Sequence, residues 1–440
     1  MKEVEDKVKP VKKVTIQERK YNARLYPFYK MCAWDLLFYY AIAFVFLVQT
    51  KGMSPAEVML TDAIYPFLKL IFQMPGLTII DKLGKRKSLI VGNFSLSISI
   101  VILIVSNGIP MVILSYAFMA FAFAIKNVAE TNLLYDSVPD KKGKGIFSKI
   151  EEKGARNYYF LDGITSMLTG FLFVINGYIP MMICLMFTVI AIAMSTCFKE
   201  ICEIKEEKVE TLKGRIQGYF QDIKTAFQFI FHSRRLQAIM VFTFFFYGLV
   251  YASYTLRESL LDDLQIPAQF FAIIIASLTI LSGVTASLQG IIHQKFRNKA
   301  LTFIGLTYVI TFVMIGIIGV YCQLPKEAIL GILLVFFAIQ YALQSPYDIL
   351  YQKYLKSFAT PEMRVKIATT FDFIKSVSSF AIAMVCSYLL EVMNPRNSFL
   401  VIGIVFTAIL AIVLYWMKDK FGLKPEAYRK QDIQNVEQEM

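Results

Sequence analysis

The strongest constraint on the fold is a repeat of short motifs between two hydrophobic halves of the chain. Pro55-Ala56 recurs as Pro267-Ala268, Ile79-Ile80 as Ile291-Ile292, and Tyr135-Asp136 as Tyr347-Asp348. One offset of 212 residues (267 minus 55) fits all three pairs without a gap. A membrane protein built from two such repeats places its binding site between them, near the middle of the bilayer.

The composition agrees with a membrane protein. Apolar residues make up 56% of the chain, charged residues only 18%, and the mean hydropathy is +0.54. Charged residues make up roughly a quarter of a typical soluble protein. The net charge of +13 comes largely from loops between apolar segments, so orientation in the membrane explains it and no nucleic-acid partner is expected.

Segments of about 20 apolar residues are long enough to cross the hydrocarbon core as helices. The sequence predicts an all-α membrane protein with twelve transmembrane helices in two pseudo-symmetric six-helix bundles. The expected spans are 27–49, 55–80, 88–106, 109–138, 156–175, 178–198, 236–260, 267–292, 300–322, 327–352, 364–391 and 397–417.

These spans divide the chain into five parts. The expected parts are a tail at 1–26, a first bundle at 27–198, a linker at 199–235, a second bundle at 236–417 and a tail at 418–440. Within the linker, apolar residues recur at helical spacing between Leu212 and Ile230, which predicts an amphipathic helix on the membrane surface. Residues 1–26 lack the pattern of a signal peptide.

Lysine and arginine are concentrated in alternate loops, which predicts the orientation. The connections after the second, fourth, eighth and tenth spans are basic, as are the tails and the linker, whereas the opposite connections carry few positive charges. Both termini and the linker are therefore expected in the cytoplasm of a cell whose plasma membrane holds the protein.

Asp81-Lys82-Leu83-Gly84-Lys85-Arg86-Lys87 follows the second span. It resembles the loop signature G-x-L-a-D-r-x-G-r-k of the major facilitator superfamily, although Leu77 stands where the signature has its first glycine. The resemblance covers nearly the whole chain. It implies secondary transport by alternating access, with spans 1, 4, 7 and 10 lining the cavity and the protein acting as a monomer.

The same resemblance implies a cytoplasmic gate at the inner ends of the spans. The duplicated Tyr-Asp motif supports the gate, although simple helix-end charges at the lipid headgroups would look the same. The expected gate residues are Asp81, Lys85, Arg86, Asp136, Arg156, Asp348 and Arg364.

Ionisable side chains deeper in the spans are candidates for coupling and substrate binding. Asp35 lies roughly 12 Å inside the first span at about 1.5 Å per residue, has no local partner, and is the first candidate for proton coupling, with Glu130 second. Lys126 and Glu130, and likewise Asp372 and Lys375, are spaced to share a helix face and form ion pairs. These pairs either serve coupling or merely neutralise each other.

Further polar and aromatic residues in the spans are expected to line the cavity. Arg257 and Glu258 are expected at an external gate or interface. The full set of expected cavity residues is Lys69, Lys126, Asp162, Tyr247, Tyr251, Tyr341, Gln344, Asp372 and Lys375.

The sequence leaves three functions open. The first is proton-coupled export of small amphipathic compounds, which the aromatic residues and acids favour. The second is uptake of a small organic anion or peptide, which Lys69, Lys126 and Lys375 favour. The third is a non-transporting sensor.

No enzymatic motif is present, and neither the six cysteines nor the two histidines are spaced as metal ligands, so no cofactor and no metal are expected.

Overall fold

In the computed structural model, the described part of the chain consists of helices joined by short connections and contains no strand. The structure describes residues 15–138, 143–201, 212–285, 288–296, 299–359 and 363–421. The elements are α1 (Ile16–Ala33), α2 (Ala43–Val45), the π-helical turn η1 (Phe46–Thr50), α3 (Pro55–Leu83), α4 (Lys85–Val105), α5 (Ile109–Ser137), α6 (Gly143–Ile175), α7 (Tyr178–Cys197), α8 (Leu212–His232), α9 (Arg234–Asp263), α10 (Ala268–Thr285), α11 (Leu288–Phe296), α12 (Ala300–Tyr321), α13 (Lys326–Phe358), α14 (Arg364–Val392) and α15 (Pro395–Phe421).

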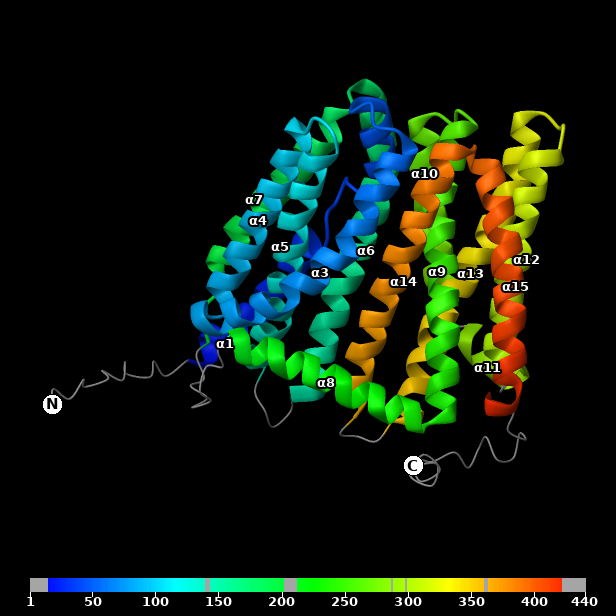
Figure 1. The fold of residues 1–440 in the computed structure, drawn as a ribbon. Coiled ribbons are helices and arrows are strands. Elements are labelled where there is room, and N and C mark those ends of the chain that lie inside the picture. The colour runs from blue at the N-terminus through cyan, green and yellow to red at the C-terminus, as the bar shows by residue number, and fades with distance from the viewer. Residues whose placement is uncertain are drawn as a thin grey trace.

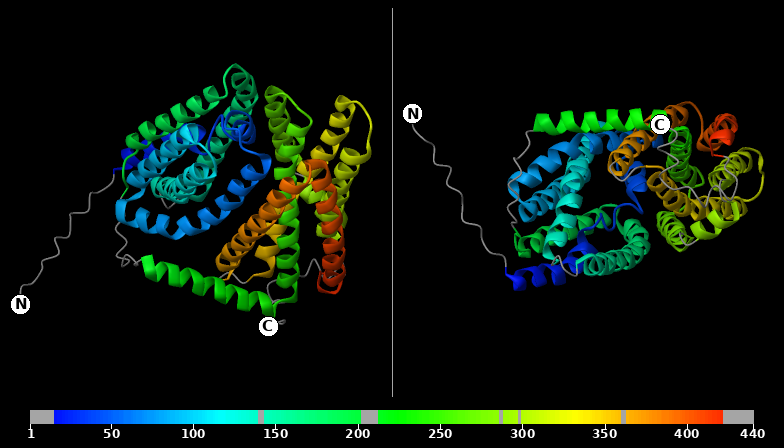
Figure 2. Two further views of the ribbon diagram at one scale, coloured as in Figure 1. Left: turned by 45° about the horizontal axis from the view of Figure 1, so that its top comes forward. Right: turned by 90° about the horizontal axis from the view of Figure 1, so that it is seen from below.

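The long helices stand side by side in two groups, α3 to α7 and α9 to α15, and the start of α1 and the end of α15 lie at the same end of the bundle (Figure 1). Helix α8 crosses that end beneath both groups, and a view from below shows it along one edge (Figure 2). The amphipathic helix expected in the linker is therefore present. It buries Ile223, Ala226 and Ile230 while Phe220 stays exposed.

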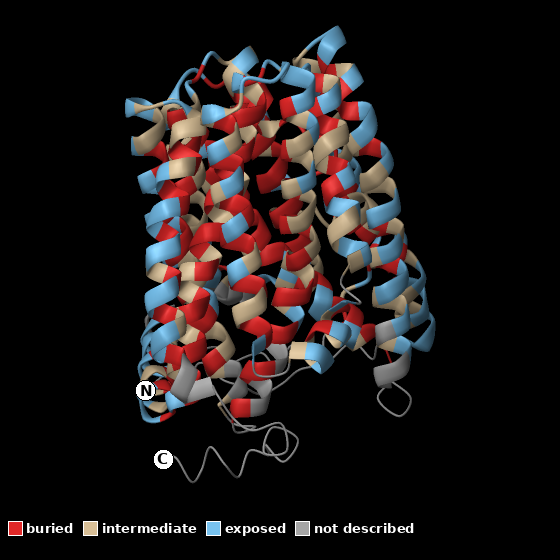
Figure 3. Cartoon of the chain, turned by 90° about the vertical axis from the view of Figure 1, so that its right-hand side faces the viewer, coloured by how far each residue is buried: buried red, intermediate tan, exposed pale blue. Residues whose placement is uncertain are grey.

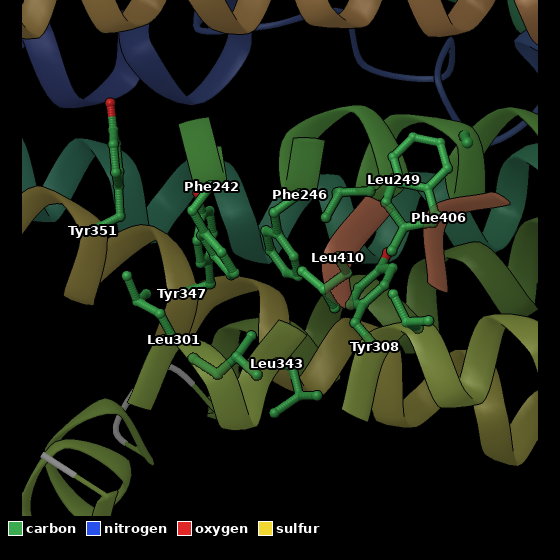
Figure 4. Close-up of a cluster of buried hydrophobic side chains, with 14 of the residues drawn as sticks. Phe242, Phe246, Leu249, Leu301, Tyr308, Leu343, Tyr347, Tyr351, Phe406 and Leu410 are labelled. Carbon is green, nitrogen blue, oxygen red and sulfur yellow. The ribbon is translucent and has the colours of Figure 1, made fainter. Parts of the chain in front are cut away.

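Along the described helices, residues coloured as buried alternate with exposed ones from one end of the bundle to the other (Figure 3). The second half has a core of its own around Phe246, whose ring centroid lies 5.4 Å from that of Phe242 and 4.3 Å from that of Tyr347 (Figure 4). Tyr347 is only 1% exposed, whereas its repeat partner Tyr135 is 61% exposed. The two copies of the Tyr-Asp motif therefore differ in their surroundings.

The first expected span, 27–49, is wrong as a continuous helix. Helix α1 ends at Ala33, and the chain forms turns as far as Ile42 before α2 and η1 resume. Phe38 adopts a φ of 64°, a left-handed conformation that is uncommon outside glycine. No glycine or proline lies between residues 34 and 42, so hydropathy alone predicts one continuous helix through this stretch.

The eighth expected span, 267–292, contains α10 and α11, and residues 286–287 between them lie outside the described residues. Ten helices among the described residues are long and apolar enough to cross a membrane, and neither α1 nor α3 is among them. Helix α3 is nevertheless continuous over 29 residues and carries Glu57, Asp62 and Lys69 within its length. The all-α fold is confirmed, and the count of twelve spans stays a prediction.

The two halves meet tightly where α6 crosses α10. A Cβ atom added to Gly170 would lie 2.6 Å from Cα of Gln269, 2.8 Å from the carbonyl oxygen of Ala268 and 2.9 Å from Cβ of Ala272. Nearby, at the same end of the bundle, the Ser387 hydroxyl donates to the carbonyl oxygen of Ala56 at 2.8 Å. The end of the bundle away from the chain termini is therefore closed.

We expect Gly170→Ala to destabilise this closed arrangement by about 1–3 kcal/mol, because backbone atoms rather than flexible side chains would meet the added methyl group. Gly163→Ala is the matched control on the same helix, since an added Cβ there meets nothing within 4 Å. The measurement is thermal unfolding of both purified variants in detergent. An equal or smaller loss for Gly170→Ala would contradict the tight crossing.

Candidate functional site

A cavity of about 810 Å³ lies between the two halves. It is bounded by the break after α1, by the middle of α6, and on the other side by α9, α10 and α13. The lining residues are Trp34, Asp35, Tyr40, Ala41, Tyr158, Tyr159, Asp162, Gly163, Ser166, Tyr254, Ile275, Ala276, Thr279, Ile280, Ser282, Gly283, Val284, Tyr341, Gln344 and Ser345.

Asp35 enters this cavity because α1 ends just before it. Its Oδ1 atom accepts hydrogen bonds from the Leu36 amide at 2.9 Å and from the Tyr40 hydroxyl at 2.8 Å. Sequence reasoning expected no local partner, and the turn at residues 37–42 supplies one by bringing Tyr40 back to Asp35. Both Asp35 and Tyr40 face the cavity.

Of the residues expected in the substrate cavity, three line it: Asp162, Tyr341 and Gln344. Arg257 donates to the Tyr341 hydroxyl, and the Tyr254 hydroxyl donates to Oε1 of Gln344. The lining therefore has two carboxylates and several hydroxyl-bearing aromatic rings. No lysine, arginine or histidine belongs to it among the described residues.

Lys126 and Glu130 are buried behind the break rather than in the cavity, and they are not paired with each other. The Lys126 ammonium donates to the carbonyl oxygens of Ala33 and Trp34, at 2.8 Å for Trp34. These carbonyls are at the carboxyl end of α1, where helical bonding stops and the helix dipole is negative. Lys126 is 0% exposed and Glu130 is 2% exposed.

Glu130 keeps one carboxylate oxygen, Oε2, buried without a hydrogen-bond partner in the described structure. Lys126 and Lys30 are nevertheless close enough to act on its charge. Lys30 is itself engaged with Glu151, and its ammonium lies 4.4 Å from the centre of the Trp34 ring. The positive charges of Lys126 and Lys30 thus offset the negative charge of Glu130 without a direct hydrogen bond to its Oε2 atom.

Asp372 and Lys375 do not form the expected ion pair. The Lys375 ammonium lies over the rings of Tyr351 and Tyr247, at 4.3 Å and 5.1 Å from their centres. Asp372 is exposed, as is Lys69 on the facing helix α3. Lys69 acts electrostatically on both Asp35 of the first half and Asp372 of the second.

Tyr251 points to a residue that sequence reasoning missed. Its hydroxyl donates to the carbonyl oxygen of Asp62 at 3.1 Å, and both residues line a second cavity together with Glu258. Asp62 lies seven residues inside the second expected span, so its charge within an apolar segment was a signal that could have found it.

The first-half part of the expected gate is assembled at the start of α4. Lys85 forms an ion pair with Asp136, and the Arg86 guanidinium donates to the carbonyl oxygen of Thr196 at 2.6 Å. Glu200, also missed from the sequence, accepts from the backbone amides of Lys85 and Arg86, both at 2.8 Å. A carboxylate there satisfies free amides and complements the helix dipole.

Two other expected gate residues, Arg156 and Asp348, are not joined to it. Arg156 is exposed and has no ion pair within the described structure, and Asp348 is partly buried near Lys375. The side chains of Asp81 and Arg364 lie outside the described residues.

Comparison with known proteins shows which family has this architecture. A model of the Major Facilitator Superfamily matches residues 31–325. A search of the curated proteins found no match. Among solved structures, the nucleoside transporter NupG aligns with a TM-score of 0.70 at 12% identity, covering 92% of this chain and 100% of that one.

Two other transporters align over similar lengths. A bacterial homologue of the human lysosomal transporter Spinster, in an inward-facing and unoccupied conformation, has a TM-score of 0.64 at 12% identity and covers 94% of this chain and 100% of its own. A POT family transporter in complex with a thioalcohol-conjugated peptide has a TM-score of 0.63 at 12% identity, covering 93% and 96%. The chain therefore belongs to the Major Facilitator Superfamily and has the fold of its membrane transporters.

Proposed function

We propose that this transporter exports small amphipathic compounds across the plasma membrane in exchange for protons. The observation that carries the proposal is the lining of the 810 Å³ cavity, with aromatic rings, hydroxyl groups and the two carboxylates of Asp35 and Asp162. Such a surface suits a molecule with an apolar body and a few hydrogen-bonding groups.

Uptake of an organic anion is less well supported. The basic residues that favoured it are occupied elsewhere, since Lys126 caps α1 and Lys375 lies over two tyrosine rings. Lys69 alone of the three is exposed, and it does not line the cavity. The nucleoside and peptide transporters among the structural neighbours favour a small organic substrate over an inorganic ion.

Alternating access supplies the mechanism. The halves are closed around Gly170 and Ser387, at the end away from the termini. If the termini lie in the cytoplasm as proposed, this closed end faces outward, which favours loading of substrate from the inside. Asp35 then carries the proton, because a carboxylate in an apolar span is costly to keep charged when its cavity is closed to water.

The test is flux in proteoliposomes that contain the purified monomeric protein. A panel of amphipathic cations, neutral compounds, organic anions and dipeptides is screened for movement driven by an imposed pH gradient. Acceleration of amphipathic compounds alone supports export by proton exchange. Acceleration of anions or dipeptides alone favours the uptake function, and absence of any flux favours a sensor.

We expect both termini and α8 to face the cytoplasm, because the basic loops lie at that end. A single cysteine at position 222, on the exposed side of α8, is the probe in a background without native cysteines. An impermeant maleimide should label it only after the cells are opened. Labelling in intact cells would reverse the orientation, and with it the direction of transport.

We expect Asp136→Asn to impair transport while substrate binding stays largely intact, because it removes the ion pair with Lys85 and shifts the balance between inward-facing and outward-facing states. Asp348→Asn tests the second copy of the motif in the same assays. Transport rate and equilibrium binding are measured side by side. Normal transport in both variants would remove the gate interpretation.

A further inference from the structure

A second cavity of about 210 Å³ lies between the halves beside the first one, and Tyr40 lines both. Each half contributes one acid to its wall, Asp62 from α3 and Glu258 from α9. Five tyrosines complete its polar lining: Tyr39, Tyr40, Tyr65, Tyr116 and Tyr251.

Asp62 is held in place from both halves. The Tyr116 hydroxyl, from the first half, donates to Oδ1 of Asp62 at 2.9 Å. The Tyr251 hydroxyl, from the second half, donates to the Asp62 carbonyl oxygen at 3.1 Å. The carboxylate is therefore oriented at the boundary between the halves, where transport requires the contacts to change.

The charges of this cavity do not cancel. Glu258 lies 3.5 Å from Arg257, which is its ion-pair partner. That guanidinium also donates to Tyr341 and lies over the Tyr254 and Tyr341 rings, and it does not line the second cavity. Glu258 thus has this one guanidinium as its partner, Asp62 has no ion pair within the described structure, and no basic side chain among the described residues lines the cavity. A positive ligand would supply the missing charge.

We propose that this cavity is a subsite for an organic ammonium group, with Asp62 and Glu258 as its counter-ions. Tyrosine rings around a cation attract it through their negative faces, which is how aromatic cages bind substituted ammonium groups. The apolar part of the ligand extends past Tyr40 into the larger cavity. If the ligand of this subsite is the transported molecule, the subsite narrows the substrate class to amphipathic organic cations. That step rests on the proposed function.

Binding of matched probes to the detergent-purified full chain tests the subsite without any flux. The probes are tetramethylammonium, choline and benzyltrimethylammonium. The neutral control is 3,3-dimethylbutan-1-ol, which has the shape of choline without its charge. Isothermal titration calorimetry is expected to detect the cations and to show binding of the neutral alcohol that is weaker by about ten-fold or more.

Asp62→Asn and Glu258→Gln should each weaken binding of the cations by about ten-fold and leave the neutral alcohol unchanged. The amide in the first variant still offers an oxygen to the Tyr116 hydroxyl, so the local hydrogen bond is retained. Asp222→Asn, on the exposed surface of α8, is the matched control and should change neither. Gel filtration and circular dichroism check that each variant is folded.

Equal binding of choline and the neutral alcohol, unchanged cation binding in both acid variants, or no binding of any cation to the wild-type chain overturns the subsite. The proposed function fails differently. If the cations bind as expected but a pH gradient drives no flux of any compound, the subsite stands and proton-coupled export does not.

Discussion

Asp35→Asn is expected to abolish accumulation of substrate driven by a proton gradient while leaving exchange of substrate across the membrane. The amide imitates a permanently protonated carboxyl, so the carrier can still change conformation but cannot return a proton. It also still accepts a hydrogen bond from Tyr40, whose hydroxyl lies 2.8 Å from Oδ1. The measurement is pH-gradient-driven flux in proteoliposomes, with counterflow of labelled substrate as the companion assay.

Two further variants show whether the effect belongs to Asp35. Asp222→Asn on the surface of α8 removes an acid that pairs with Lys366 and lines neither cavity, and it should leave both assays unchanged. Glu130→Gln tests the second candidate, which is buried behind the break. If Asp35→Asn still concentrates substrate and Glu130→Gln does not, Glu130 carries the proton and the present assignment is wrong.

Most of the fold could be predicted from the sequence because the length and apolar spacing of each helix are contained in its own segment of the chain. The lengths of the apolar segments predicted nearly every long helix, and the spacing of apolar residues predicted α8. The break after Ala33 could not be predicted in this way. Apart from Asp35, the residues of the break are apolar or aromatic and include neither glycine nor proline. The stabilising partner of the break, Lys126, lies 92 residues from Trp34 in sequence and meets it only in the folded chain.

The candidate site could also be predicted only in part, because some of its features depend on the local sequence and others on the folded chain. Deep acids such as Asp35 and Asp162 were visible because charge in an apolar segment is costly. The partners of these charged side chains could not be predicted. Spacing along one helix shows which side chains can reach each other, but it does not show which other groups in the fold compete for the same side chain. Lys126 is four residues from Glu130, yet it bonds to the open carbonyls at the end of α1. Those carbonyls exist as acceptors only because the helix breaks.

Lys126→Met is expected to be the most destabilising single change around the site. The variant leaves the Ala33 and Trp34 carbonyls without their donor and removes the cation that compensates Asp35 and Glu130. Breaking such a buried charged arrangement costs about 3–5 kcal/mol. Lys375→Met is the matched control, since that ammonium lies over tyrosine rings and is only partly buried. Thermal unfolding of the two variants should show a much larger loss for Lys126→Met.

The chain offers a reporter at the break itself, because Trp34 and Trp416 are its only tryptophans. In a Trp416→Phe background, emission comes from Trp34 alone, whose ring packs edge-on against Tyr158 and Tyr159 at centroid distances of 5.0 Å and 5.2 Å. Lys126→Met should shift this emission and Lys375→Met should not. Adding Glu130→Gln should recover part of the lost stability, since it removes one uncompensated acid. Unchanged Trp34 emission with full stability in Lys126→Met would mean that the break does not depend on Lys126.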